Sequence, residues 1–329
     1  MQEAVNRIVQ NMGVFGAEFD GKRLDANETM TFARELEHIY AKVYETEFPA
    51  LLGRQLVPEN TEGVDPADES ATTTEVTGFG QMKKITNWAK DFPGLTEQGH
   101  QFTGPIYSWG GSFEYTLQDM RRAARIGRPL VARKAVLARN IAERTLDKLL
   151  CTGDTTLGLY GLANLDVALG VGTSAKQTTG FWSAQTDPSA ILKDVVQMAS
   201  DISNNTGGDH TGNTLALDLP SFNYIRFTKL GSSANPSDQS ILQYLLKNVD
   251  GLTSIVGWNR LNTACAGGHS RAVMYDRTPD VLFHIMAQPL EIFPPQQKGL
   301  TFESLLHMRW GGVRVPRPKA ITYMDQLGS

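Results

Sequence analysis

The sequence has little cysteine, no long apolar run and no excess of basic residues. Its only cysteines, Cys151 and Cys265, are too few for a disulfide framework and fit a reducing compartment. No segment approaches the roughly 20 apolar residues of a membrane-spanning helix, and the first residues lack the basic and apolar regions of a signal peptide. The formal net charge of -4 argues against a dedicated nucleic-acid-binding protein. We therefore expect synthesis in the cytosol, and any contact with DNA should come from a local patch.

Motifs of the common enzyme families are also missing. The sequence contains no G-x-S-x-G, H-E-x-x-H or G-x-G-x-x-G. Residues 16–22 match the start of a phosphate-binding loop, but Arg23 stands where a hydroxyl should hold magnesium. Cys265 and His269 offer two ligands where structural zinc needs four, and 209–210, Asp-His, is expected at a polar loop tip. We predict no catalytic residue, no cofactor and no metal, and therefore a protein that is not an enzyme.

What is present is the composition of an ordinary globular protein. Hydrophobic residues make up 41% and charged residues 20% of the 329 residues, enough for a core and about two domains. Residues 1–25 resemble a loosely packed arm, and a helix is predicted to start at the N-cap candidate Asn27. Its apolar stripe consists of Phe32, Leu36, Ile39, Tyr40 and Val43. Pro49 and Gly53 mark its end.

An acidic segment, residues 58–80, follows this helix. Its acidic residues are Glu59, Glu62, Asp65, Asp68, Glu69 and Glu75. Because nothing bulky and apolar lies between Val64 and Val76, the segment cannot offset its ordering entropy by packing within its own domain. The β-type composition of residues 55–57, 72–77 and 81–86 predicts a long hairpin that lies on something else.

The clearest helical pattern lies in the middle of the chain. A strand over 105–115 and a short helix over 117–126 lead to a break at Gly127. A long helix is then predicted over 129–151, with Pro129 in its first turn and Gly153 as its stop. Its apolar stripe is Val131, Ala135, Ala138, Ala142, Leu146 and Leu149.

The second half alternates between helices and strands and then turns to strand alone. The expected helices cover 188–203, 220–229 and 238–247, and the strands between them cover 214–217, 253–256 and 271–275. This alternation predicts a compact α/β block. The final strands are expected over 281–286, 290–293, 300–310 and 320–323. They imply that the chain returns to the domain that holds the long helix.

Residues 113–164 carry the most specific pattern. The stretch FEYTLQDMRRAARIGRPLVARKAVLARNIAERTLDKLLCTGDTTLGLYGLAN holds a strand, a short helix, a long alanine-bearing helix, a Gly-Asp turn and a G-L-x-G-L-x-N segment. Together with VTGFGQMKKITNWAKDFP at 76–93, it resembles the major capsid proteins of tailed bacteriophages, whose Hong Kong phage fold is shared with encapsulins. The turn positions of the family pattern are Gly153, Asp154, Gly158, Gly161 and Asn164.

The resemblance implies an α+β fold with an arm, an extended loop and two domains. The arm and its helix would cover 1–53, and the extended β-hairpin loop 54–104. The peripheral domain would comprise 105–185 and 281–313 with the spine helix 129–151, and the axial domain 186–280 and 314–329. The extended loop, with its acids and with Lys83 and Lys84, would lie across a neighbouring subunit. Some relatives cross-link lysines of this loop, but no partner asparagine is identifiable in this sequence.

The resemblance also implies a structural function and a set of partners. The chain would assemble through pentamers and hexamers into an icosahedral phage head around double-stranded DNA. Expected partners are a scaffolding protein, a portal, decoration proteins and packaged DNA held by non-specific contact, with no membrane. Since the arm starts almost at residue 1, the scaffold is expected as a separate protein or as a removed leader. The expected location is the virion, after assembly in the host cytoplasm.

A run of basic residues without any acid lies between Met120 and Ala142. It consists of Arg121, Arg122, Arg125, Arg128, Arg133, Lys134 and Arg139. One interpretation is a solvated helix face with scattered intersubunit ion pairs. A second is a surface on the shell interior that neutralises DNA phosphates. A third pairs the run with the acidic segment of a neighbouring copy.

Two other functions stay open at this point. The first is an encapsulin-type shell that stores a cargo enzyme, although encapsulins usually lack an arm of this length before the hairpin. The second is a soluble α/β enzyme with an unfamiliar site, against which the missing motifs count. An electron micrograph of the purified protein would separate a shell-forming protein from an enzyme.

Overall fold

The structure is a computed structural model of the chain. It describes residues 50–61, 63–84, 92, 94–127, 130–185, 188–232, 235–265 and 267–327. The predicted N-terminal arm and helix and the loop-like residues 16–22 lie outside the described residues, as do Glu62, Arg128 and Pro129. All statements below concern the described part.

The two central helices begin and end close to the positions that the sequence predicts. Helix α4 (Leu117–Ile126) begins with a capping box, in which Thr116 and Asp119 satisfy each other's backbone N–H groups. It ends at Gly127, whose φ of 70° lies in the left-handed region that suits glycine. Helix α5 (Leu130–Thr152) follows. The helices expected over 117–126 and 129–151 are confirmed within the described residues.

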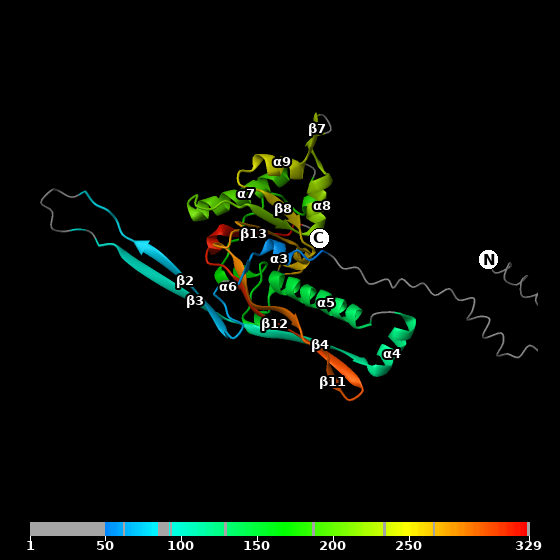
Figure 1. Ribbon diagram of the computed structural model, residues 1–329. Helices are drawn as coiled ribbons and strands as arrows, with labels where there is room; N and C mark the ends of the chain where they lie inside the picture. Colours follow the sequence, from blue (N-terminus) through cyan, green and yellow to red (C-terminus); the bar gives the residue numbers. More distant parts are fainter. Residues whose placement is uncertain are drawn as a thin grey trace, which may run out of the picture. The chain divides into compact units, whose positions relative to one another are not determined.

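The long strands form one sheet that lies against α5 (Figure 1). Its order is β1 (Glu59–Asn60), β10 (Phe283–Ile292), β12 (Thr301–Arg314) and β11 (Gln296–Lys298), and β4 (Tyr107–Thr116) pairs with β12. The two strands expected over 281–286 and 290–293 are one strand, β10. Between His284 and Glu291 the pairing of β10 with β12 is irregular. This irregularity interrupts the apolar pattern of β10 but does not end the strand.

The long hairpin is present, but its strands differ from those predicted. Strands β2 (Ser70–Phe79) and β3 (Thr96–Pro105) pair antiparallel over their whole length. Residues 81–84 are not a strand, and 85–86 lie outside the described residues. Residues 55–57 were expected as a strand, which is wrong, since helix α3 (Gly53–Leu56) covers most of them. Leu56 and Val57 are fully buried, so their apolar character reflects core packing.

The α/β block contains a second sheet with the order β13 (Ile321–Asp325), β9 (Arg271–Tyr275), β5 (Thr214–Leu217) and β8 (Ser254–Gly257). Helices α7 (Pro188–Thr206), α8 (Leu219–Phe227) and α9 (Ile241–Asn248) belong to the same block. The helix expected from residue 238 begins at Ile241, because 235–240 form β7, which pairs with β6 (Lys229–Ser232). The last strand, β13, pairs with β9 rather than with the long strands.

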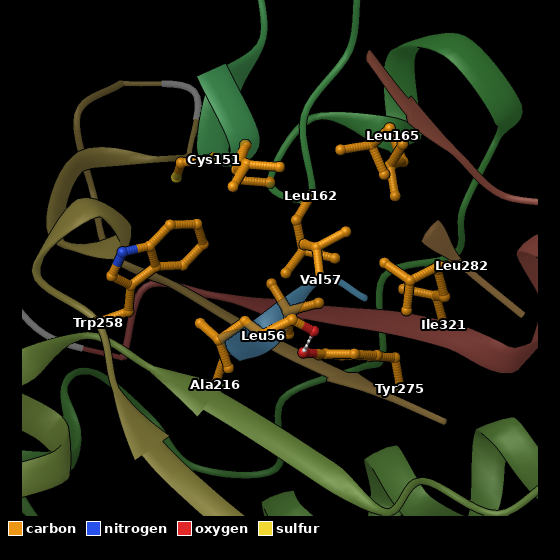
Figure 2. Packing of buried hydrophobic residues seen from close by; sticks show 14 of the residues in the cluster. Leu56, Val57, Cys151, Leu162, Leu165, Ala216, Trp258, Tyr275, Leu282 and Ile321 are labelled. Carbon is orange, nitrogen blue, oxygen red and sulfur yellow. Dashed lines mark hydrogen bonds between the residues drawn. The ribbon is translucent and has the colours of Figure 1, made fainter. Parts of the chain in front are cut away.

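Side-chain alternation divides this second sheet between two cores. Leu215, Leu217 and Met274 point into a core shared with Ile191, Val195 and Met198 of α7. Ala216, Tyr275 and Tyr323 point the other way, into a core shared with the end of α5, with α3 and with β12. Figure 2 shows this second core, in which the Tyr275 hydroxyl donates a 2.6 Å hydrogen bond to the carbonyl oxygen of Leu56. The two sheets are therefore joined by continuous packing.

Candidate functional site

The turn after the spine helix brings the five predicted turn residues together. Gly153 has a φ of 64°, and a Cβ there would lie 2.3 Å from the carbonyl oxygen of Leu159. Asp154 caps a short 3-10 helix (Thr155–Leu157) by accepting a 3.1 Å hydrogen bond from the Thr156 N–H. Gly158 ends this helix with a φ of 69°. These two glycines are required by backbone conformation, as predicted.

Gly161 is needed in this turn because it has no side chain and so lets two backbone segments approach closely. It is not among the residues with positive φ, but a Cβ there would lie 2.4 Å from the carbonyl group of Cys151. Asn164 accepts a 2.8 Å hydrogen bond from the Gly161 N–H and donates a 2.7 Å bond to the carbonyl oxygen of Thr152. The glycines of the segment GLYGLAN, residues 158–164, predict a turn that needs positive φ. This holds at Gly158 but is wrong at Gly161, where the close approach of two backbones requires a residue without a side chain.

The C-terminal strand holds this turn in place. The Tyr323 hydroxyl donates a 2.6 Å bond to the carbonyl oxygen of Leu162 and accepts a 3.1 Å bond from the Leu165 N–H. Beside it, buried Arg271 donates to Asp325 at 2.7 Å and to Asp166 at 3.0 Å. Burial acts to lower the pKa of Arg271, but these two carboxylates outweigh it and raise the pKa. Buried hydrogen bonds and ion pairs therefore join the turn to the C-terminal strand.

Three of the acids predicted for intersubunit contacts are engaged within the chain. The Glu59 carboxylate forms a 2.8 Å ion pair with Arg54, and Arg54 also forms an ion pair with Glu143 of α5. The Asp65 carboxylate accepts a hydrogen bond from the Ala67 N–H, and the Asp68 carboxylate accepts one from the Asp65 N–H. These two side chains therefore stabilise the turn before β2. Three of the six carboxylates of the acidic segment are thus bound within the chain, by Arg54 or by backbone N–H groups. The segment therefore does not present all of its acidic side chains to another subunit.

The hairpin carries exposed apolar side chains that sequence reasoning overlooked. Val76 is 61% exposed and Phe79 is 52% exposed, and the others are Met82, Phe92, Leu95 and Phe102. Glu69, Lys83 and Lys84 are exposed too, and Glu75 is half-buried in β2. Val76 and Phe79 stand three residues apart in β2 and therefore point to opposite faces of the ribbon, so the hairpin exposes apolar side chains on both faces. The signal was available, since Val76, Phe79, Met82, Phe92 and Leu95 stand within a polar, glycine-rich stretch.

The basic run is divided between two helices. Arg121, Arg122 and Arg125 are exposed on α4, where Arg122 lies 3.7 Å from Asp119. Arg133, Lys134 and Arg139 lie on α5, and the Lys134 ammonium donates to the backbone carbonyl oxygen of Glu114 in β4. The run is therefore two surfaces separated by the break at Gly127.

The remaining histidine and cysteine candidates do not form a site. The Cys265 N–H donates to the carbonyl oxygen of His269, which closes a backbone turn. In the described ranges, no three His, Cys, Asp or Glu side chains are grouped to hold a metal ion. Asp209 is exposed as expected, but the prediction of a loop tip is wrong for His210. Its Nδ1 lies 2.9 Å from Asp276 Oδ2 and its Nε2 lies 2.9 Å from Arg317 Nη1. None of the helices that the structure describes is long and apolar enough to cross a membrane.

Comparison with known proteins agrees with this architecture. The capsid of Myoviridae phage XM1 matches with a TM-score of 0.76 at 19% identity, over 94% of this chain and 100% of that chain. A structure from Mycobacterium phage Bobi matches with a TM-score of 0.63 at 12% identity, over 94% and 100%. A virus-like particle from Pyrococcus furiosus matches with a TM-score of 0.50 at 13% identity, over 82% and 90%. At these identities the likeness shows the fold, which is the predicted α+β capsid fold.

The family assignment comes from the sequence. No curated protein sequence is similar enough to count as a relative. Residues 80–327, more than half of the chain, match the family described as "Major capsid protein". This match favours the capsid over the encapsulin-type shell and the soluble enzyme. The chain therefore belongs to the major capsid protein family and is a structural shell protein of the tailed-phage head.

Proposed function

We propose that the chain builds the head by laying its β2–β3 hairpin on a neighbouring copy within rings of five and six subunits. The exposed apolar groups of the hairpin carry this proposal. Val76 and Phe79 are more than half exposed in the single chain, and burial of apolar side chains away from water is favourable in free energy. A neighbouring subunit would cover them. Repetition of this contact around every ring makes a closed shell stable even when each interface is of modest strength.

The test places a charge on the hairpin without disturbing the subunit core. Phe79→Asp should leave the unassembled subunit folded, because Phe79 is exposed on a two-stranded ribbon. It should abolish shells seen by electron microscopy and by sedimentation. Phe79→Leu, which keeps an apolar side chain, serves as the matched control and should assemble. Normal shells from Phe79→Asp would contradict the proposal.

The division of labour between the domains belongs to the same proposal. The α/β block with α7, α8 and α9 would form the axial domain and meet its copies around the symmetry axes. The long sheet with α5 would form the peripheral domain. Gly127, exposed and left-handed between α4 and α5, would be the point where the helical spine bends during maturation. Comparison of this joint in empty and filled particles tests the idea.

A second candidate function is contact with packaged DNA through α4. Arg121, Arg122 and Arg125 are exposed on a helix that has no buried residue. Such a surface would bind phosphates without reading sequence, and its affinity would fall steeply with salt. Reversal of two charges, Arg121→Glu with Arg125→Glu, should lower genome retention and flatten its salt response. Unchanged retention and an unchanged salt response would exclude this role.

The remaining partners follow from family membership alone. We propose that a scaffolding protein, a portal and decoration proteins complete the head, and that assembly takes place in the host cytoplasm. Purified particles analysed by mass spectrometry would identify these components.

A further inference from the structure

Arg314, the last residue of β12, is a cation without a counter-ion. Its Nε and Nη2 atoms are buried and have no hydrogen-bond partner among the described residues. No carboxylate of the described part pairs with it, and burial lowers the pKa of its guanidinium. At Arg271, by contrast, Asp166 and Asp325 outweigh burial and raise the pKa. A buried charge without a partner is costly, so Arg314 needs an acceptor that the described residues do not supply.

The two unpaired atoms of Arg314 form one hydrogen-bonding fork. The N–H groups of Nε and Nη2 point in the same direction in the plane of the guanidinium, at the spacing of the two oxygens of a carboxylate. One carboxylate can therefore satisfy both atoms. The group lies against the hairpin at Gly104 of β3, where an added Cβ would overlap Nη1, Nη2 and Cζ. Gly104 thus leaves the space that the guanidinium occupies.

Arg314 also lines a cavity at the base of the hairpin. The cavity has a volume of about 370 Å³ and lies among β3, the end of β12, the turn after α5 and helix α6 (Leu165–Leu169). These elements meet where the hairpin leaves the subunit (Figure 1). Gln101, Thr103 and Gly158 in its lining are exposed, so the cavity is open to solvent.

The walls of this cavity are mainly apolar. Phe102, Leu165 and Val313 contribute apolar side chains, and Tyr160 adds a hydroxyl group. Arg314 is the one charged residue of the lining within the described part of the chain. Binding sites for small ligands combine apolar walls with a few polar groups that fix the orientation. A phosphate ion would find one cation and no apolar match here, whereas a carboxylate on a carbon chain matches both the fork and the walls.

We propose that this cavity is a binding site for a carboxylate group attached to an apolar carbon chain. The carboxylate accepts hydrogen bonds from Nε and Nη2 of Arg314, and the carbon chain lies against Phe102 and Leu165. The guanidinium ends a flexible side chain, so a small rotation turns its fork towards the cavity. The inference does not depend on the proposed function.

The chemical class of the ligand is tested with hexanoate on the full-length unassembled subunit, by titration calorimetry. Hexanoate should bind saturably. Inorganic phosphate lacks the carbon chain and hexanol lacks the carboxylate, so each should bind at least about tenfold more weakly. No binding of hexanoate, or equal binding of phosphate, would overturn the inference.

The role of Arg314 is tested by two matched variants on β12. Arg309 lies on the same strand, donates to the carbonyl oxygen of Pro66 and does not line the cavity. Arg314→Met should abolish the binding of hexanoate and raise the melting temperature by about 2–5 °C, because an unpaired buried charge is removed. Arg309→Met should bind hexanoate as the unaltered chain does. Equal binding by both variants would overturn the site.

The same ligand chemistry has two sources, a free small molecule or an acidic residue beside apolar ones in a further polypeptide. Purified shells distinguish them. If a polypeptide supplies the carboxylate, the sites in shells are filled, and shells should not bind hexanoate although the unassembled subunit does. If a free molecule supplies it, shells should bind hexanoate as the subunit does. Either result supports the site, and loss of binding in Arg314→Met is required in both cases.

Discussion

Asp147 and Trp258, 111 positions apart in the sequence, meet in the core through a 3.2 Å hydrogen bond from the indole Nε1 to the carboxylate. The same carboxylate accepts a 2.9 Å bond from the Gly53 N–H and a 3.0 Å bond from Arg260 Nε. Asp147 is buried in α5, so one side chain connects the spine helix to α3 and to the α/β block. A satisfied buried carboxylate of this kind positions its partners, because each would lose a bond if it moved.

Replacement of Asp147 should therefore destabilise the subunit strongly. Asp147→Ala leaves the buried Gly53 and Trp258 N–H donors without their acceptor, while Arg260 stays partly solvated and keeps a bond to the Arg144 carbonyl oxygen. We expect a loss of about 2–4 kcal/mol in the free energy of unfolding. Urea denaturation of the unassembled subunit measures it. Glu143→Ala is the control, since the Arg54–Glu143 pair is exposed and should contribute about 1 kcal/mol or less. Equal losses in the free energy of unfolding from both variants would show that Asp147 does not hold the spine helix to α3 and the α/β block.

The glycines of the spine turn should differ in their tolerance of alanine. Gly158→Ala introduces left-handed strain alone, because nothing lies within 4 Å of the added Cβ, and should cost about 1–2 kcal/mol. Gly153→Ala adds a backbone collision to the same strain and should cost about 2–5 kcal/mol. Gly161→Ala has the collision without the strain. Denaturant midpoints of the three variants would contradict this account if Gly158→Ala were the most destabilised.

His284 predicts a stability that falls with acid. Burial and, secondly, the nearby Arg54 together lower the pKa of this fully buried side chain to about 4. In the unfolded chain its pKa is about 6.5, so between pH 6.5 and 4 the unfolded state binds a proton that the folded state does not. The free energy of unfolding should fall by about 1.4 kcal/mol per pH unit over this window and level off below it.

The comparison of variants isolates this histidine from the carboxylates that titrate in the same range. His284→Gln should show a smaller loss of stability between pH 6.5 and 4 than the unaltered chain. His100→Gln, on the exposed hairpin strand β3, should keep the full loss. Identical pH profiles for all three proteins would assign the effect to other groups.

The two cysteines should differ in reactivity. Cys151 is fully buried, and burial raises its pKa to about 12, so at pH 8 it is both inaccessible and protonated. Cys265 is partly exposed. Alkylation of the folded, unassembled subunit should modify Cys265 first and Cys151 only after unfolding, as peptide mass spectrometry would show. Modification of Cys151 at the rate of Cys265 would show that the end of α5 opens readily.

Elements with strong local signals were predictable from the chain. The short helix over 117–126, the break at Gly127 and the apolar stripe of α5 are short-range features, and their positions match the structure. The strands over 214–217 and 271–275 also match, because they are short, buried and enclosed by turn residues. The family signature in 113–164 is local in the same sense.

Elements that depend on distant partners were not predictable. Strand β3 contains Gly, Gln and Thr residues with little apolar pattern, and it is a strand because β2 pairs with it residue for residue. Helix α3 resembled a strand because burial against α5 selects the same apolar residues that a strand would. The β6–β7 hairpin has no apolar alternation at all.

The sequence by itself determined the local elements, the absence of known catalytic motifs and the capsid family, since each depends on residues close together in the chain. Only the tertiary structure decided which polar groups are used internally and which edges stay open. Arg54 forms an ion pair with Glu59, so this acid is bound within the chain. Lys134 donates to the backbone of β4 at Glu114, whereas Ser108, Gly110 and Ser112 of the same strand are exposed. The physical reason is that hydrogen bonds and ion pairs form between neighbours in space, and folding alone decides which residues become neighbours.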